Sequence, residues 1–251
     1  MTADQVGAAA MAAAAAWSPG ENTCSFLSLS VTLSTDAGPL VIPAAQAAVV
    51  FRETTWCRIL DDGSCSTKAE DIATYDSSAL MLTTATVNPH TGGMVQAGIE
   101  VNAVDHAWAD LVAHPARTDA VDLQNGLTHE LGHFIGLDHN CAPDGDAHPP
   151  LDDTGRPAPD CLGAPLAITE ATMFPDAPPG DVQKRTLADD DRHGLCDAYP
   201  VAADPGTCGA PDPGPLGGGC ACDAAPVTRG APLAALGLAG LLALGRRRGR
   251  R

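Results

Sequence analysis

The amino-acid sequence predicts an α+β fold, and three features of the chain support this prediction. Residues 79–87 are rich in leucine, threonine and valine, and a turn signal separates them from a second strand-like segment, residues 94–102, as in a β-hairpin. Residues 119–135 carry apolar side chains at helical spacing, and residues 3–17 are rich in alanine, the residue with the highest helix propensity. The chain has 251 residues, 45% of them apolar, which is enough for one domain of ordinary size with additional segments.

The first segment, residues 3–17, is predicted to be an amphipathic helix that stops at Ser18-Pro19-Gly20. The alternative interpretation is a secretory signal. The segment lacks the basic residues with which such signals begin, and Asp4 is its only charged residue. The helix is therefore the favoured interpretation, and an export signal is not visible at this end of the chain.

Four segments are predicted to be β-strands. Residues 26–33 alternate apolar with small polar side chains, and residues 47–52 have the composition of a buried strand. Residues 79–87 and 94–102 are separated by the turn signal at residues 88–93, which contains asparagine, proline and two glycines. These last two strands are predicted to pair as a hairpin.

The stretch from His129 to His139 has the pattern H-E-x-x-H-x-x-G-x-x-H. On a helix, His129 and His133 lie one turn apart on the same face, so both imidazoles can bind one metal ion. Gly136 can adopt a positive φ, which ends the helix and lets His139 return as a third ligand. Glu130 lies beside the first two histidines and is placed to hold a water molecule on the metal.

Three neutral imidazoles and one open position are typical of a catalytic zinc site, whereas structural zinc sites usually have four protein ligands. Zinc lowers the pKa of a bound water to about 7, and a neighbouring carboxylate can accept the proton. These are the components needed to attack a peptide carbonyl. A short H-E-x-x-H pattern recurs by chance, but the additional glycine and third histidine disfavour that interpretation.

A long loop, residues 140–170, follows the histidines and precedes a last helix. That helix is predicted over residues 186–199, with Thr186 as its cap. Aspartates of the loop could hold calcium. Their spacing fits no calcium-binding pattern, so a solvated loop is the favoured interpretation. The aspartates are Asp144, Asp146, Asp152, Asp153 and Asp160.

Acidic residues dominate the chain up to its C-terminal segment. Eight of the 14 basic residues and all 31 acidic residues precede position 229, so residues 1–228 carry a net charge of −23 and the whole chain −17. A body this acidic repels nucleic acid, which excludes that class of partner. The charge is interpreted as a solvated surface rather than as an acidic binding patch.

Nine cysteines are many for a cytosolic protein, and none of them forms a C-x-x-C pair. Disulfides in an oxidising compartment are therefore predicted. Proximity in the sequence suggests three pairs and leaves Cys24 without a partner. The suggested pairs are Cys57 with Cys65, Cys141 with Cys161, and Cys196 with Cys208.

The histidine motif resembles that of the metzincin metallopeptidases, and within them the matrixins in their short bacterial form. The resemblance covers roughly residues 8–200. Three further segments carry it: Leu137-Asp138-His139 as the end of the zinc motif, Ala171-Thr172-Met173-Phe174-Pro175 as a methionine turn, and Asp190-Asp191-Arg192-His193-Gly194-Leu195 with Tyr199 as the C-terminal helix.

The resemblance implies a zincin fold, with a twisted, mostly parallel sheet, an antiparallel edge strand, three helices, the active-site helix and the Met-turn. It implies that His129, His133 and His139 bind one zinc ion, that Glu130 is the general base and that Met173 forms the Met-turn. A substrate is expected to lie antiparallel to the edge strand, which the resemblance assigns to about residues 94–102.

Composition divides the chain into a catalytic domain, residues 1–200, a proline- and glycine-rich linker, residues 201–228, and a hydrophobic C-terminal segment, residues 229–251. The last segment has an uncharged apolar run followed by five arginines, which is typical of a short membrane anchor with a cytoplasmic end. It resembles the C-terminal sorting signal of myxobacterial surface proteins. This resemblance implies membrane contact before processing, and export to the cell surface or the extracellular space.

The sequence therefore predicts an exported, monomeric, zinc-dependent endopeptidase that acts on a protein or peptide substrate. A zinc-bound water would attack the peptide bond, with Glu130 as the general base. Two alternatives remain: a metzincin of another branch with a different substrate, and a surface binding protein that keeps the fold without significant turnover. The presence of Glu130 beside all three ligands favours an enzyme.

Overall fold

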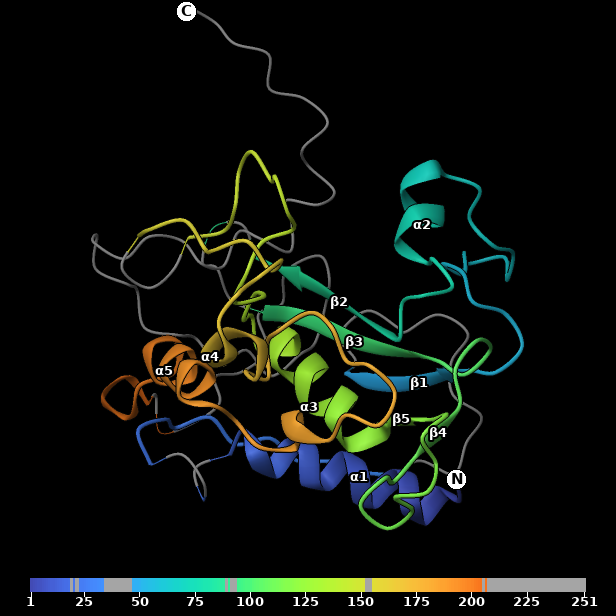
Figure 1. Cartoon of the computed structure of the whole chain (residues 1–251), viewed down its shortest axis with the longest axis horizontal. Coiled ribbons are helices and arrows are strands. Elements are labelled where there is room, and N and C mark those ends of the chain that lie inside the picture. The colour runs from blue at the N-terminus through green and yellow to red at the C-terminus, as the bar shows by residue number, and fades with distance from the viewer. Residues whose placement is uncertain are drawn as a thin grey trace, which may run out of the picture.

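The computed structural model describes residues 1–18, 20, 23–33, 47–88, 90, 94–151, 155–204 and 206. Within these residues the chain contains five α-helices and two small sheets (Figure 1), so the predicted α+β class is confirmed. The C-terminal segment and all but the first residues of the predicted linker lie outside the described residues. Among the helices described, none is both long and apolar enough to cross a membrane.

The N-terminal helix α1, Ala3–Ala16, forms as predicted. Thr2 caps it by accepting a hydrogen bond from the backbone of Gln5, whose side chain returns one to the Thr2 backbone. Its small side chains allow a close approach to the histidine-bearing helix α3. Trp17, directly after α1, is fully buried and donates its indole N–H to the carbonyl of Thr128, at 2.8 Å. This bond fixes α1 against α3.

The main sheet has three strands, β1 (Ala48–Arg52), β2 (Met81–Val87) and β3 (Met94–Asn102), in the order β1-β3-β2. β1 runs parallel to β3, and β2 and β3 form the predicted antiparallel hairpin. The predicted placing of the edge strand at residues 94–102 is wrong. β3 is the central strand, because its second half is buried and it pairs on both sides, and β2 is the antiparallel edge strand of the described sheet.

One predicted strand does not form. Residues 26–33 alternate between half-buried and exposed, as their sequence suggests, but they form no strand. Leu27 and Leu29 pack against the cluster around Trp17. The alternation arises because one side of this segment is buried against helices. A β-strand also requires a neighbouring strand to pair with, and apolar spacing alone does not show whether one is present.

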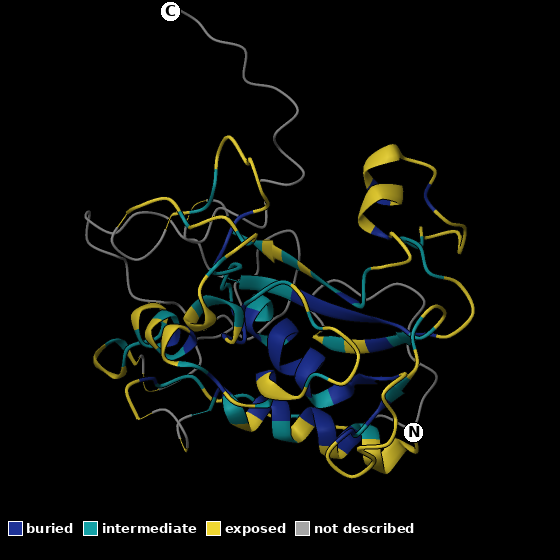
Figure 2. Cartoon of the chain, viewed as in Figure 1, coloured by how far each residue is buried: buried dark blue, intermediate teal, exposed yellow. Residues whose placement is uncertain are grey.

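Alternate residues of β2 and β3 face α3 and form the main core. Met81, Ile99 and Val101 pack there against Leu123 and Leu127 of α3, all of them buried. Figure 2 shows this buried layer between the sheet, α3 and α1. The core is aliphatic, and it holds α3 rigidly against the sheet.

Helix α3, Leu123–Phe134, begins one residue after Asp122. The fully buried Asp122 carboxylate accepts hydrogen bonds from the backbone of Asn125 and Leu111, both at 2.8 Å. Arg185 also donates to this carboxylate. This capping network ties the start of the helix to β4–β5, a short parallel pair of strands at Trp108–Ala109 and Val121–Asp122, and to the 3₁₀ turn at Gln183–Arg185.

The C-terminal helix α5 spans Asp189–Ala198 and is shorter than predicted. Its predicted cap, Thr186, is wrong, because Ala188 occupies the cap position and the Asp191 side chain accepts a hydrogen bond from the Ala188 backbone, at 2.8 Å. Two short helices were not predicted from the sequence. They are α2, Ala69–Thr74, and α4, Leu166–Thr169.

Three cysteine pairs lie at disulfide distance. Two are the predicted pairs, Cys57–Cys65 and Cys141–Cys161. The predicted Cys196–Cys208 pair is wrong, because Cys196 pairs with Cys24. The backbone next to Cys24 forms a bridge with residues just after α5, which brings the two sulfurs together. Three disulfides are typical of an extracellular protein.

Candidate metal centre

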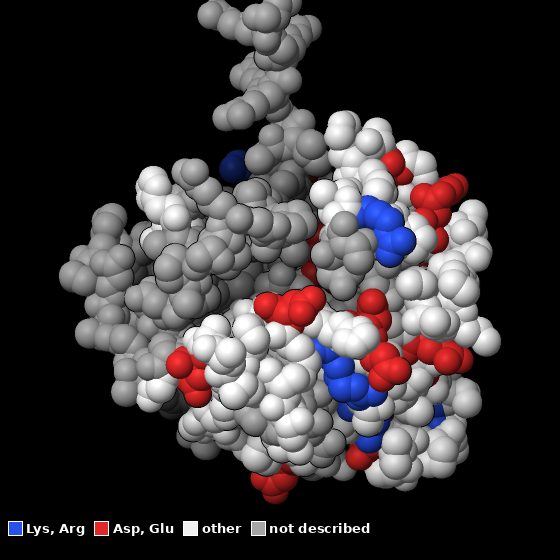
Figure 3. Space-filling model, turned by 90° about the vertical axis from the view of Figure 1, so that its left-hand side faces the viewer, with Lys and Arg blue, Asp and Glu red and all other residues white. Residues whose placement is uncertain are grey.

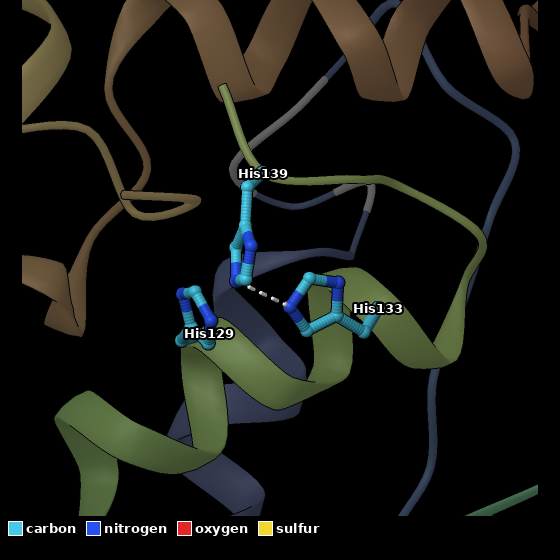
Figure 4. Close-up of side chains that lie close together, drawn as sticks. All are labelled: His129, His133 and His139. Atoms are coloured by element: carbon cyan, nitrogen blue, oxygen red, sulfur yellow. Dashed lines mark hydrogen bonds between the residues drawn. The ribbon is translucent and has the colours of Figure 1, made fainter. Parts of the chain in front are cut away.

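Three histidines converge at the C-terminal end of α3. His129 and His133 lie one turn apart on the helix, and Gly136, with φ of +93°, turns the chain so that His139 faces them (Figure 4). Their ligand atoms all lie within 4.8 Å of one another. The Nε2 atoms of His133 and His139 are 3.1 Å apart. The predicted convergence of the three imidazoles is therefore confirmed.

Two of the imidazoles are oriented by backbone carbonyl groups. Nδ1 of His129 donates to the carbonyl of Thr172, at 2.6 Å, and Nδ1 of His133 donates to the carbonyl of Leu137, at 2.8 Å. A neutral imidazole that donates through Nδ1 keeps its lone pair on Nε2, which is the tautomer that binds metal. The two carbonyls thus direct both Nε2 atoms toward the space shared with His139.

This donor set fits a zinc ion. Zinc–nitrogen bonds are about 2.0–2.1 Å long, so two nitrogens on a tetrahedral zinc lie roughly 3.4 Å apart. The 3.1 Å separation between His133 and His139 is close to that value. Three nitrogen donors leave one coordination position for water or a substrate, as in catalytic zinc sites.

Burial keeps the imidazoles of His129 and His139 neutral. It lowers the pKa of His129 well below 6.5, and it lowers the pKa of His139 to about 3, with the neighbouring charge of His133 as the second cause for both. At neutral pH these two side chains are therefore neutral imidazoles rather than imidazolium ions. A metal that binds them does not have to displace a proton. The centre is therefore prepared to bind a cation at neutral pH.

Glu130 lies on α3 next to His129 and is buried. Thr83 of β2 donates its hydroxyl hydrogen to the Glu130 carboxylate, at 2.6 Å, which fixes the carboxylate at the sheet side of the histidines. Burial raises the pKa of Glu130, and the Thr83 hydrogen bond opposes that rise. A buried carboxylate with a raised pKa is suited to accept and return a proton. The sequence did not identify Thr83.

Met173 lies directly beneath α3. A Cβ atom at Gly132 would lie much closer than 3.0 Å to the Met173 sulfur, and Cβ contacts that short are essentially never observed. The contact between Met173 and α3 is possible because Gly132 has no side chain. The preceding residue, Thr172, supplies the carbonyl that orients His129. The turn around Met173 therefore packs against the helix and orients the His129 imidazole.

Asp191 of α5 holds this turn in place. Its buried carboxylate accepts hydrogen bonds from the backbone of Thr172 and Met173, at 2.8 and 2.9 Å, in addition to that of Ala188. Three backbone donors satisfy the charge away from water. Asp191 therefore links α5 through Thr172 to His129. The sequence placed Asp191 in the last helix but did not indicate this contact.

A buried lysine lies close to the centre. Lys184 has 1% of its surface exposed, its ammonium donates to the carbonyl of Phe174, and its backbone donates to the Asn125 side chain. Burial lowers the pKa of Lys184 to about 8, against the attraction of Asp181, Asp176, Glu130 and Asp191. The sequence gave no indication that Lys184 is buried, since lysine is rarely found inside proteins.

The described aspartates of the loop after the histidines do not gather into a ligand group. Among the described residues, the three histidines are the one group of three or more histidine, cysteine, aspartate or glutamate side chains that could hold a metal ion. Asp152 and Asp153 lie outside the described residues. Acidic side chains occur in several separate groups on the face of the molecule shown in Figure 3, as on a solvated acidic surface.

No protein-family model matches this chain. A search of curated proteins also finds no significant match. The residues of the metal centre and their geometry are therefore the evidence for the function.

Proposed function

We propose that the protein is a zinc-dependent endopeptidase of the metzincin type, similar to the matrixins. The observation that carries the proposal is the convergence of His129, His133 and His139 beside the buried carboxylate of Glu130. Two further features support it. Met173 lies beneath the histidine helix, and an antiparallel edge strand runs along the side of that helix.

Each residue has a distinct part in the proposed reaction. The three histidines would hold the zinc, which would supply a Lewis acid that lowers the pKa of a water molecule. Glu130 accepts a proton from the attacking water and returns it to the amine of the leaving peptide. Thr83 positions the Glu130 carboxylate by its hydrogen bond, at 2.6 Å. All of these groups come from one chain, so we expect the active form to be a monomer.

The substrate would bind along β2. The outer side of this strand has no partner within the described part of the chain, so its backbone can pair with an extended peptide. Thr83 lies on β2 and contacts Glu130, so a peptide paired with β2 would pass beside the metal centre. This moves the expected substrate strand from residues 94–102 to Met81–Val87.

The proposed compartment is the cell surface or the extracellular space. The three disulfides support it, because disulfides persist in oxidising environments. The C-terminal segment, residues 229–251, would serve as the sorting signal and as a membrane anchor before processing.

The proposal is tested by the Glu130→Ala variant. Labelled casein serves as a generic substrate, and zinc content is measured in parallel. We expect chelator-sensitive hydrolysis by the unaltered protein, and at least ~10²-fold lower turnover in the variant with its zinc retained, since a general base contributes about that much. The exposed Glu53 provides a matched control, and Glu53→Ala should retain activity. Zinc retention with no hydrolysis by the unaltered protein would instead favour the surface binding protein.

A further inference from the structure

A second site lies on the face of the sheet that points away from the histidines. Along β2 and β3, the residues that alternate with the core positions line a cavity of about 190 Å³ between the sheet and the segment around Tyr75. Thr84, Glu100 and Arg52 contribute from strands β2, β3 and β1, and Arg58 from the segment after β1. The cavity is separated from the metal centre by the thickness of the sheet.

Every carboxylate oxygen at this cavity already accepts a hydrogen bond. Glu100 is buried and accepts hydrogen bonds from Arg52 on one oxygen and from the Tyr75 hydroxyl on the other. Asp71, behind Arg58, accepts from that guanidinium at 2.7 Å and from the Ser66 hydroxyl at 2.5 Å. The acidic groups therefore have little capacity left to receive a cation or a donor group from a ligand.

The guanidinium groups, in contrast, keep donors to spare. Each carries five N–H groups. Arg58 uses its Nε to bind Asp71, and its terminal nitrogens make no hydrogen bond to any described residue. Arg52 directs Nε and one terminal nitrogen to a single oxygen of Glu100, and its other terminal nitrogen makes no hydrogen bond to a described residue. Each guanidinium is thus paired with one carboxylate, Arg52 with Glu100 and Arg58 with Asp71, and the unused N–H groups rather than a net charge are what the cavity offers to an anion.

Tyr75, Thr84 and Thr86 also line the cavity, and their side chains suit a small organic molecule. The Tyr75 ring lies 5.5 Å from the Arg58 guanidinium and forms a flat side. The hydroxyls of Thr84 and Thr86 add groups that donate and accept. At about 30 Å³ for each water in the liquid, a volume of about 190 Å³ holds roughly six waters or a compact molecule of similar size.

We propose that this cavity binds a small oxyanion, a carboxylate or a phosphate on a compact polar body, through the unused N–H groups of Arg58 and Arg52. A planar fork of donors matches two oxygens of such a group. The anion completes the hydrogen bonding of the two arginines, and Thr84 and Thr86 bind its hydroxyl or ether groups. This site is independent of the metal centre and of any peptidase activity.

The test is calorimetric titration of the full-length protein, in a buffer free of carboxylates and phosphate, with citrate and separately with inorganic phosphate. We expect saturable binding of at least one probe with one site per chain. The probe that binds distinguishes a carboxylate ligand from a phosphate ligand. Absence of saturable binding for both probes would overturn the proposal.

Variants locate the site. Arg58→Gln removes one fork and should weaken binding by at least ~10-fold, the scale of one lost charged hydrogen bond. The matched control is Arg117→Gln, because Arg117 makes an exposed ion pair with Asp119 and does not line the cavity. Equal affinity in the two variants would refute the assignment.

A second variant covers the case in which loss of Arg58 disturbs the fold. Replacing Thr84 and Thr86 together by valine keeps their shape and both ion pairs, and it removes only the hydroxyls from the cavity. We expect weaker binding of citrate or phosphate with zinc content unchanged. Unaltered binding in both the valine variant and Arg58→Gln would place the anion elsewhere.

Discussion

The contact between Gly132 and Met173 can be tested by adding a single methyl group to helix α3. In Gly132→Ala, the new Cβ would be 3.0 Å from the Trp17 ring and 3.1 Å from the Met173 methyl, and closer still to the Met173 sulfur. Trp17 is fully buried and fixed by its hydrogen bond to the Thr128 carbonyl, so it cannot move aside. Met173 must therefore shift away from α3.

Two opposing effects determine the change in unfolding free energy. Alanine is favoured over glycine within a helix by about 1 kcal/mol. Overpacking a close contact in a core costs about 1–3 kcal/mol. We expect the second effect to be larger, because the sulfur lies in the middle of the Met173 side chain and cannot rotate away as a terminal methyl can. We therefore predict a net loss of unfolding free energy of up to about 2 kcal/mol. The shift should also move the Thr172 carbonyl that orients His129, and so weaken metal binding.

Gly126→Ala, in the same helix, is the matched control. Its Cβ would meet chiefly the terminal methyl of Met81, at 2.7 Å, which can rotate away. This variant should stay within about 1 kcal/mol of the unaltered protein, because the helix preference of alanine offsets the contact. Urea unfolding with the disulfides intact, together with zinc competition against a chelator dye, measures both quantities. Equal stability and equal zinc affinity in Gly132→Ala and Gly126→Ala would refute this account of the turn.

Two further predictions concern buried charges near the metal centre. Asp191→Asn leaves a single acceptor oxygen for three backbone donors, so it should lower the unfolding free energy by about 2 kcal/mol and weaken zinc binding, as measured by the same two assays. The Lys184→Met variant tests the pH dependence of stability. Between pH 8 and 10.5 the lysine is protonated in the unfolded chain and neutral in the folded chain. The unfolding free energy of the unaltered protein should therefore rise with pH relative to that of the variant, by up to roughly 3 kcal/mol. A stability difference that stays constant across this window in urea unfolding would contradict the burial of a charged Lys184.

The convergence of the three histidines could be predicted from the sequence because their relation is local. One helical turn separates His129 from His133, and a glycine with positive φ returns His139, so eleven consecutive residues contain all three. The hairpin was predictable for the same reason, since its two strands are adjacent in the chain and a turn signal separates them.

The supporting contacts could not be predicted because they depend on how distant elements pack. Thr83 and Glu130 meet only after β2 packs against α3, and nothing in the β2 sequence distinguishes this threonine from Thr84. The bonds from Asp191 to the methionine turn likewise form only when α5 docks.

The wrong predictions have the same origin. Residues 26–33 have the alternation of a strand, yet they lie against helices rather than beside another strand. Cys24 was left without a partner because its partner, Cys196, is 172 residues away in the chain. Spacing in the sequence favours near pairs, and long-range disulfides follow from the fold.

The most direct test of the central claim is the metal content of the purified full-length protein, measured by elemental analysis alongside the His139→Ala variant. Three converging imidazoles and one open position predict one zinc ion per chain in the unaltered protein, and loss of most of that zinc when only His129 and His133 remain. Absence of zinc, a stoichiometry near two, or full zinc retention in His139→Ala would contradict the single three-histidine centre.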